Sequence, residues 1–142
     1  RPDLVAMCLV YLGLANPDLD VDERIRHLRD GLAIATAQGD HECAGRPYSN
    51  LSLVLYCFGR WDELTDCVAA GLAFAAEWGL TLHTYLLEVP RCLLLMRRGD
   101  WTGAEQGFRA ALARGGRSPT ACSSGCTTCT GGGRSPVCCS AC

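Results

Sequence analysis

Apolar side chains recur at steps of three and four residues along the first 114 residues of the chain. The clearest sets are Ile25, Leu28, Leu32 and Ala35; Leu51, Val54, Leu55 and Phe58; and Leu64, Val68, Leu72 and Ala75. Such steps are typical of an amphipathic α-helix, because the side chains of a strand alternate with a period of two. The pattern predicts helices over about 3–15, 20–38, 42–58, 60–78, 81–98 and 100–114.

Four glycines lie between these segments at intervals of twenty residues, namely Gly39, Gly59, Gly79 and Gly99. Glycine is preferred just past a helix end, where the chain turns into the left-handed conformation. Asp40 and Asp100 directly follow two of these glycines, and we expect them to cap the next helix. One helix and one tight turn therefore occupy each twenty residues.

A longer repeat of forty residues joins these helices in pairs. Gly31-Leu32-Ala33 recurs as Gly71-Leu72-Ala73, and Ala111-Leu112-Ala113 is a third copy. Gly59-Arg60-Trp61 recurs as Gly99-Asp100-Trp101. Several matches at one spacing indicate an internal repeat of two helices.

The repeat predicts an all-α fold, a right-handed α-solenoid of three two-helix hairpins with units of about 1–39, 40–79 and 80–114. One hairpin buries too little apolar area to fold alone, so stacked neighbours share a core. We expect Gly59, Trp61, Gly99 and Trp101 to be structural residues, with each Trp packed in the elbow of its hairpin. If Trp61 is fully buried, Trp61→Ala costs about 3–5 kcal/mol.

Two prolines interrupt the helical pattern. Pro47 lies near the start of the third segment, so that helix is expected to begin only around Arg46. Pro90 lies inside the fifth segment and is expected to kink it near Leu86.

The turn between helices carries a resemblance to a known family. The residues concerned are Asn50-Leu51, Gly59-Arg60-Trp61 and Gly71-Leu72, then Gly99-Asp100-Trp101, Ala104, Phe108 and Ala111-Leu112. They resemble the tetratricopeptide repeat. The period here is forty rather than thirty-four, and Leu64 stands where that family prefers Ala.

Longer repeats of this type are similar to those of large ATP-binding, LuxR-type (MalT-like) bacterial transcriptional regulators. The resemblance covers about 1–114 and implies a helical-repeat region between an ATPase module and a helix-turn-helix. The chain has no Lys, so it has no phosphate-binding loop ending in Gly-Lys-Ser/Thr. Thirteen Arg without Lys also suggest a GC-rich bacterial source.

Charge and hydropathy narrow the possible partners. The net charge is -2, which provides no basic field for direct contact with nucleic acid or an anionic membrane. No apolar run is long enough to span a bilayer, and the start has no signal-peptide pattern. We therefore expect a cytoplasmic segment cut from a longer protein.

The composition changes abruptly at Gly115. Residues 115–142 contain only Gly, Arg, Ser, Pro, Thr, Ala and Cys with a single Val, and Gly-Gly-Arg-Ser-Pro occurs twice. This composition predicts a disordered low-complexity tail, because too little apolar surface offsets the entropy of ordering. Translation of GC-rich codons out of frame would also produce it.

The alternative for the tail is a zinc site. Cys126-x-x-Cys129 and Cys139-x-x-Cys142 supply four thiolates, which can hold zinc tetrahedrally. The additional Cys122 and Cys138, and the lack of apolar support, favour the low-complexity interpretation. The sequence therefore predicts no cofactor, with zinc as the alternative. The five cysteines before Gly115 lack metal spacing and are expected to be small buried hydrophobes.

No catalytic arrangement is readable from spacing, so we predict that the chain is not an enzyme. His27, His41 and His83 fall on different segments without metal spacing. Asp62-Glu63 begins a helix, where acidic residues favour the helix dipole. The mixed-sign run 22–30 is expected to be a solvated face.

The family resemblance implies binding through the groove lined by the first helix of each hairpin. The candidates there are Tyr48, Ser52, Tyr56, Tyr85, Glu88 and Arg91. The positions of the basic clamp that some such arrays use hold Leu51 and Leu55 instead. We predict a non-catalytic scaffold for a protein or peptide partner, or for a small-molecule effector; the alternative is a small zinc-binding protein.

The last helix leaves an apolar face without a neighbour. Ala104, Phe108 and Leu112 share that face, which in a solenoid meets another repeat or a polar cap. The following residues supply neither. We therefore expect marginal stability and self-association through the uncapped ends.

Overall fold

The computed structural model describes residues 1–115, which form six α-helices. They are α1 (Pro2–Ala15), α2 (Val21–Ala37), α3 (His41–Cys57), α4 (Trp61–Glu77), α5 (Thr81–Arg97) and α6 (Trp101–Gly115). All six predicted helices are confirmed, with ends within one residue. Gly115 ends α6, and the predicted tail beyond it, with its cysteine pairs, lies outside the described residues. None of the described helices is long and apolar enough to cross a membrane.

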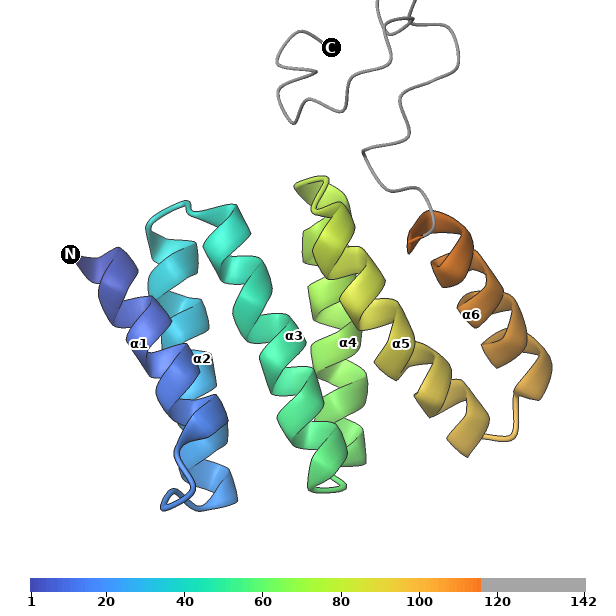
Figure 1. The fold of residues 1–142 in the computed structure, drawn as a ribbon, viewed down its shortest axis with the longest axis horizontal. Helices are drawn as coiled ribbons and strands as arrows, with labels where there is room; N and C mark the ends of the chain where they lie inside the picture. The colour runs from blue at the N-terminus through green and yellow to red at the C-terminus, as the bar shows by residue number, and fades with distance from the viewer. Residues whose placement is uncertain (116–142) are drawn as a thin grey trace, which may run out of the picture.

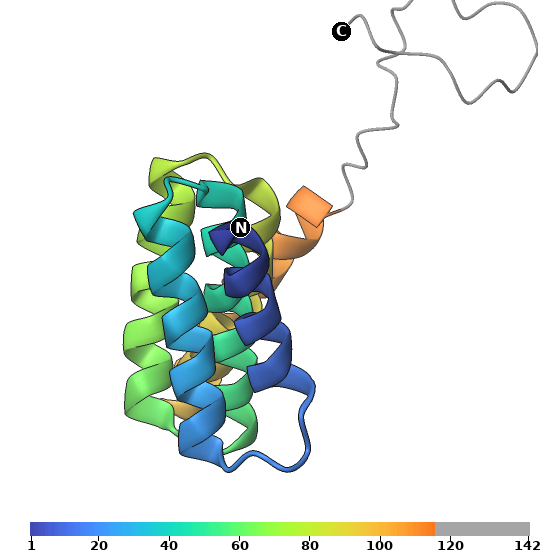
Figure 2. The same ribbon diagram turned by 90° about the vertical axis from the view of Figure 1, so that its left-hand side faces the viewer.

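The helices pack as successive hairpins, α1 with α2, α3 with α4, and α5 with α6. The hairpins line up from the N-terminus to α6 (Figure 1), and α1 and α3 lie in one layer while α2 and α4 lie in the other (Figure 2). Each second helix also contacts the first helix of the next hairpin, and α3 contacts both α1 and α5. The predicted all-α fold of three stacked hairpins is confirmed.

The tight turns have the predicted conformation. Gly39, Gly59, Gly79 and Gly99 all have positive φ, between 64° and 82°. Asp40 then accepts a hydrogen bond from the N–H of Cys43 at 3.0 Å, and Asp100 accepts one from Gly103 at 2.8 Å. Both predicted caps are confirmed.

The prediction that α3 begins only around Arg46 is wrong. The helix begins at His41, and Pro47 lies inside it with its ring almost fully buried. Because a proline lacks the N–H, it removes only the hydrogen bond to the carbonyl of Cys43. The Asp40 cap holds the start of the helix, and the buried ring adds apolar contact. Pro90 also lies inside α5, and the expected kink near Leu86 stays a prediction.

One apolar core runs through the described array. Leu28, Leu55, Leu64 and Leu87, from four successive helices, are fully buried. The main cluster extends from Val10 in α1 to Leu94 in α5. Burying each such side chain contributes about 1.5–3 kcal/mol. The hairpins therefore share their core, as the repeat predicts.

The recurring glycine of the second helices marks a close approach between helices. A Cβ on Gly31 would lie 2.9 Å from Val10 Cγ2, and a Cβ on Gly71 would lie 2.7 Å from Leu87 Cδ1. Both glycines are buried in mid-helix, where packing rather than helix propensity selects them. In the third copy, α6 has the buried Ala111 at this position.

The first helix is offset from the forty-residue register. Val10 lies against Gly31 as Tyr48 lies against Gly71, which sets α1 and α3 thirty-eight residues apart. The cause is the connection: residues 16–20 join α1 to α2, whereas residues 58–60 join α3 to α4. Positions of α1 therefore match those of α3 only after this correction.

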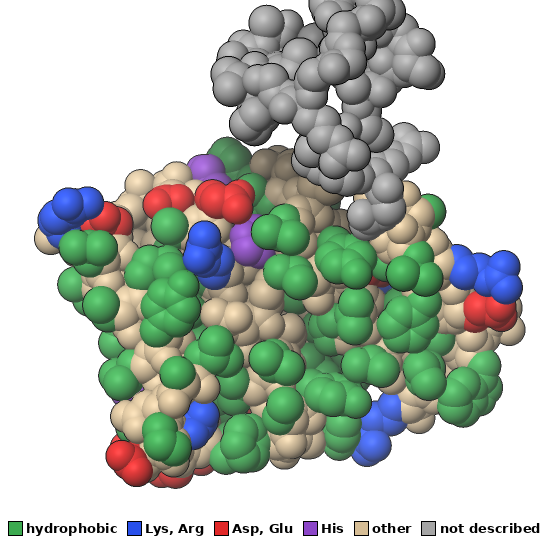
Figure 3. Space-filling model, in the orientation of Figure 1, with side chains coloured by type: hydrophobic (Ala, Val, Ile, Leu, Met, Phe, Trp, Pro, Cys, Tyr) green, Lys and Arg blue, Asp and Glu red, His purple; other side chains and the backbone are tan. Residues whose placement is uncertain are grey.

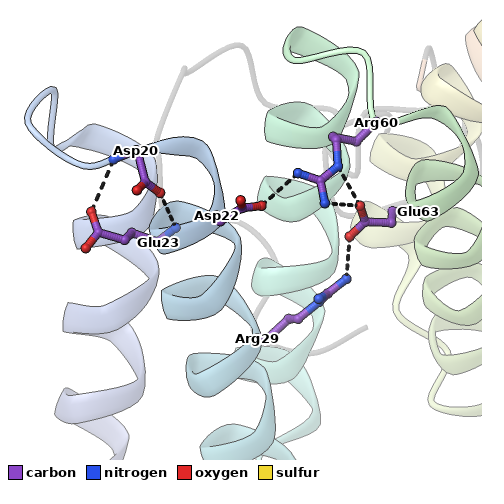
Figure 4. Close-up of polar contacts among 6 residues, drawn as sticks. All are labelled: Asp20, Asp22, Glu23, Arg29, Arg60 and Glu63. Carbon is purple, nitrogen blue, oxygen red and sulfur yellow. Dashed lines mark hydrogen bonds and ion pairs between the residues drawn. The ribbon is translucent and has the colours of Figure 1, made fainter.

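Ion pairs join the first two hairpins along their second helices (Figure 4). Arg60 pairs with Asp22 of α2 at 2.7 Å and with Glu63, and Glu63 pairs with Arg29 of α2 at 2.8 Å. Glu63 therefore links two hairpins, in addition to its favourable interaction with the dipole of α4 near the start of that helix. Because these side chains are partly or largely exposed to solvent, the ion pairs contribute more to the alignment of α2 and α4 than to the stability of the fold.

The mixed-sign run is not only a solvated face. The guanidinium of Arg24 donates to the carbonyls of Leu14, Asn16 and Leu19, at 2.5 to 3.2 Å. These bonds hold the longer α1–α2 connection, whose carbonyls lie beyond the helix bonds of α1. The expectation of a purely solvated run is wrong for Arg24.

The two repeated tryptophans have different surroundings. Trp61 is half-buried beside the core, with the Tyr56 ring edge-on at 5.7 Å and the Arg97 guanidinium 4.2 Å above its ring. Trp101 is 64% exposed. The elbow prediction is therefore wrong for Trp101, and full burial of Trp61 is also wrong. The cover over Trp61 comes from α5 of the next hairpin, and no hairpin follows α6 within residues 1–115.

Replacing Gly71 by Ala tests the close approach of helices. In an exposed helix this change stabilises by up to about 1 kcal/mol; here the added methyl meets Leu87 and Tyr48, so we expect destabilisation of about 1–3 kcal/mol. Ala73→Gly on the exposed side of the same helix is the control, with a loss of about 1 kcal/mol. Urea unfolding measures both, and a Gly71→Ala variant more stable than the parent would contradict the packing.

The tryptophan pair gives a second test. At dilution, Trp61→Ala is expected to lower the free energy of unfolding by about 2 kcal/mol, below the value for a fully buried Trp. Trp101→Ala, at the equivalent exposed position, is expected to change it by no more than about 0.5 kcal/mol. Equal losses in thermal or urea unfolding would show that the two rings are equally packed.

Candidate binding groove on the first helices

The first helices carry apolar side chains on their outer side as well as in the core. Tyr11 is 54% exposed, Leu53 52%, Leu82 61% and Leu86 41%. Figure 3 shows hydrophobic side chains spread across the face formed by α1, α3 and α5, with few charges among them. Exposed apolar area of this extent marks an interaction surface more often than chance exposure does.

Two hollows in this face join into one groove. The first, of about 370 Å³, lies between α3 and α5 and is lined mainly by Leu53, Tyr56, Leu86, Val89, Pro90 and Leu93. The second, of about 340 Å³, extends across α3 to Met7, Tyr11 and Leu14 of α1. Ser49, Asn50 and Leu86 line both hollows. The groove therefore crosses all three first helices.

The structure places two of the six predicted partner residues on this groove. Tyr56 lines it and is 38% exposed. Ser52 also borders it, but its side chain is buried and its hydroxyl donates to the carbonyl of Ser49 at 2.8 Å. Of the two, Tyr56 has the ring and hydroxyl that a ligand can reach.

The other predicted partner residues are not among the residues that line the groove. Tyr48 packs on Phe74 of α4 at 5.5 Å between ring centres, and burial raises the pKa of its hydroxyl. Glu88 and Arg91 pair with each other at 2.6 Å, and Arg91 faces Gly107 of α6. Tyr85 is half-buried on α5.

The sequence does carry a signal for the residues that were missed. Each first helix has a second apolar stripe at steps of four and three, separate from its core stripe. The stripes comprise Met7, Tyr11 and Leu14 in α1; Leu53 and Tyr56 in α3; and Leu82, Leu86, Val89 and Leu93 in α5. Assigning one stripe to the core leaves the other for the groove.

Polar groups meet at the α3–α5 contact beneath one end of the groove. His83 is buried there, with Nδ1 at 3.4 Å from Ser49 Oγ and Nε2 at 3.5 Å from Glu42 Oε1. The order resembles a serine–histidine–carboxylate triad. Yet the Ser49 hydroxyl also bonds the carbonyl of Gly45, and the backbone N–H groups around mid-helix Ser49 are taken by helix bonds. Acyl transfer needs free N–H donors for the oxyanion, and a helix interior does not provide them.

His41 and two of the cysteines are packed against other parts of the fold. His41 stacks on Trp78 with ring centres 3.3 Å apart. Within residues 1–115, no group of three or more His, Cys, Asp or Glu side chains is placed to hold a metal ion. Cys67 and Cys92 are buried, as expected for small hydrophobes, and Cys43 is half-buried. The expectation of burial is wrong for Cys8 and Cys57, which are exposed.

Comparison of the chain with protein-family models, curated proteins and solved structures finds no match.

The buried Cys67 makes a chemical test of the packing of the main core between α3 and α4. Burial raises the pKa of its thiol to about 11, so at pH 8 its thiolate fraction is about a hundredfold smaller than that of an unperturbed cysteine. We expect iodoacetamide to label Cys57 in the folded chain and to leave Cys67 unlabelled, as followed by peptide mass spectrometry. Both should react in denaturant, and equal labelling in the native chain would contradict the burial.

Proposed function

We propose that this helical-repeat domain is a non-catalytic binding scaffold, and that its groove receives an apolar segment of a partner protein. The observation that carries the proposal is the groove across α1, α3 and α5, which is lined mainly by apolar side chains and has Glu42 and Arg46 in its second hollow. A groove lined by leucines on three neighbouring helices suits an amphipathic helix, which lays an apolar stripe into it. Asn50 and the exposed Tyr56 supply polar groups that orient a ligand.

Two further features support a protein segment over other ligands. The groove between α3 and α5 is lined mainly by Leu, Val, Pro and Tyr, without a charged side chain in that hollow, which disfavours an acidic peptide or a phosphate. It is also partly open to solvent, whereas small-molecule sites bury most of their ligand.

The resemblance to the repeat regions of LuxR-type regulators suggests where such a scaffold would act. In that setting the segment bound would be part of the regulator or of a protein that controls it. A small-molecule effector in the same groove is the alternative outcome of the test below.

Binding of an amphipathic helical peptide, with leucines at i, i+3, i+4 and i+7, tests the proposal by fluorescence anisotropy. We expect Leu53→Glu to weaken binding about tenfold or more, because it places a charge in the apolar hollow. Leu112→Glu, which alters an exposed leucine outside the groove, is the control and should bind the peptide as the parent does. Equal affinity of the Leu53 variant and the parent, or of a scrambled peptide, would contradict the assignment.

A further inference from the structure

The outer face of α6 is an open apolar surface. Trp101 is 64% exposed and Leu112 69%. Together with Met96, Ala104 and Phe108 they line a shallow hollow of about 350 Å³. No helix follows α6 within residues 1–115 to cover it.

The repeat identifies this face as half of an interface that the chain completes twice. The positions equivalent to Trp101 and Leu112 are Val21 and Leu32 in α2, and Trp61 and Leu72 in α4. All four are half-buried, because α3 packs on α2 and α5 packs on α4. The face of α6 is the third copy, and it lacks the first helix that covers the other two.

The complementary half lies on α1. Val5, Leu9 and Leu12 of α1 match Cys43, Pro47 and Asn50 of α3 in the corrected register. The α3 residues are buried or half-buried, whereas Val5 is 50% and Leu12 40% exposed. No second helix precedes α1 within the described residues, so this side of α1 is open.

We propose that the outer face of α6 binds α1 of a second copy of this chain, so that copies stack end to end. The proposal does not depend on the proposed function, because neither face lines the groove between α3 and α5. Residues 116–142 are a poorer occupant by sequence, since Val137 is their only Val, Leu, Ile, Met or aromatic residue. In this fold the equivalent faces of α2 and α4 are covered by the first helices α3 and α5.

Charge supports the same register. Arg29 of α2 pairs with Glu63 of α4 at 2.8 Å, which joins the second helices of two successive hairpins. In a stacked pair of copies, the equivalent positions are Arg109 of one copy and Glu23 of the next. Both side chains are exposed, at 79% and 41%, and each already pairs with a residue of its own helix, Arg109 with Glu105 and Glu23 with Arg26. The junction therefore brings opposite charges together at the place where the chain already uses such a pair.

The two faces differ, so the contact is head to tail. Such a contact does not close by two-fold symmetry, and copies add at both ends to give an open series. The mean mass in solution is therefore expected to rise continuously with protein concentration.

Sedimentation velocity of the full chain in reducing buffer tests the proposal. The parent should show a concentration-dependent mass, and Leu112→Glu and Leu12→Glu should each be monomeric, with the apparent dissociation constant raised at least tenfold. A one-to-one mixture of the two variants should form a dimer and stop there, because one intact α6 face meets one intact α1 face. A strict monomer for the parent, or a mixture that stays monomeric, would overturn the proposal.

Matched variants separate this contact from general stickiness and from the groove. Leu82→Glu alters an exposed leucine away from both end faces and should associate like the parent. Arg109→Glu should weaken association, and adding Glu23→Arg in the same chain should restore it. If the Leu82 variant loses association equally, or if Leu112→Glu has no effect, association does not use the end faces. Failure of peptide binding in the groove would leave this result unchanged.

Discussion

The contact between the second helix of one hairpin and the first helix of the next is the interaction on which this structure depends. It buries Leu64 and Leu87 completely, half-covers Trp61, and brings Gly71 so close to Leu87 that a methyl group does not fit. A single hairpin buries too little apolar area to offset its ordering entropy. Stacking therefore provides both the stability of the array and its direction.

The same contact explains the two kinds of open surface. Because each first helix packs its core stripe against the second helices, its other stripe remains outside and forms the groove with its neighbours. Because the contact repeats, it leaves one unmatched half on α1 and another on α6. The groove and the end faces are consequences of one packing contact, which the described chain makes twice.

The sequence predicted the helices well because their ends are local: glycines in the left-handed turn and Asp40 and Asp100 as caps. It failed where tertiary packing decides. Pro47 stays inside α3 because its ring is buried in the core, and Trp101 is exposed because no hairpin follows α6 in the described chain. Neither outcome can be read from a turn motif.

The candidate site is harder to predict from sequence because polarity does not identify the residues that line the groove. Tyr48 and Ser52 are polar residues, yet Tyr48 packs against α4 and the Ser52 hydroxyl donates a hydrogen bond to a backbone carbonyl. The groove is made instead by leucines such as Leu53 and Leu86, which a single periodic assignment sends to the core. Each first helix has two apolar stripes, and only the helices that pack against it show which stripe belongs to the core. The two additional residues in the connection after α1 also shift α1 relative to the forty-residue repeat.

Native-state amide hydrogen exchange, resolved by helix, measures most directly whether contacts between hairpins hold the array together. The account predicts that α3, which contacts four other helices, exchanges most slowly and that α6, which contacts α5 alone among the described helices, exchanges fastest among the second helices. Uniform protection across the six helices, or slowest exchange in α6, would contradict it.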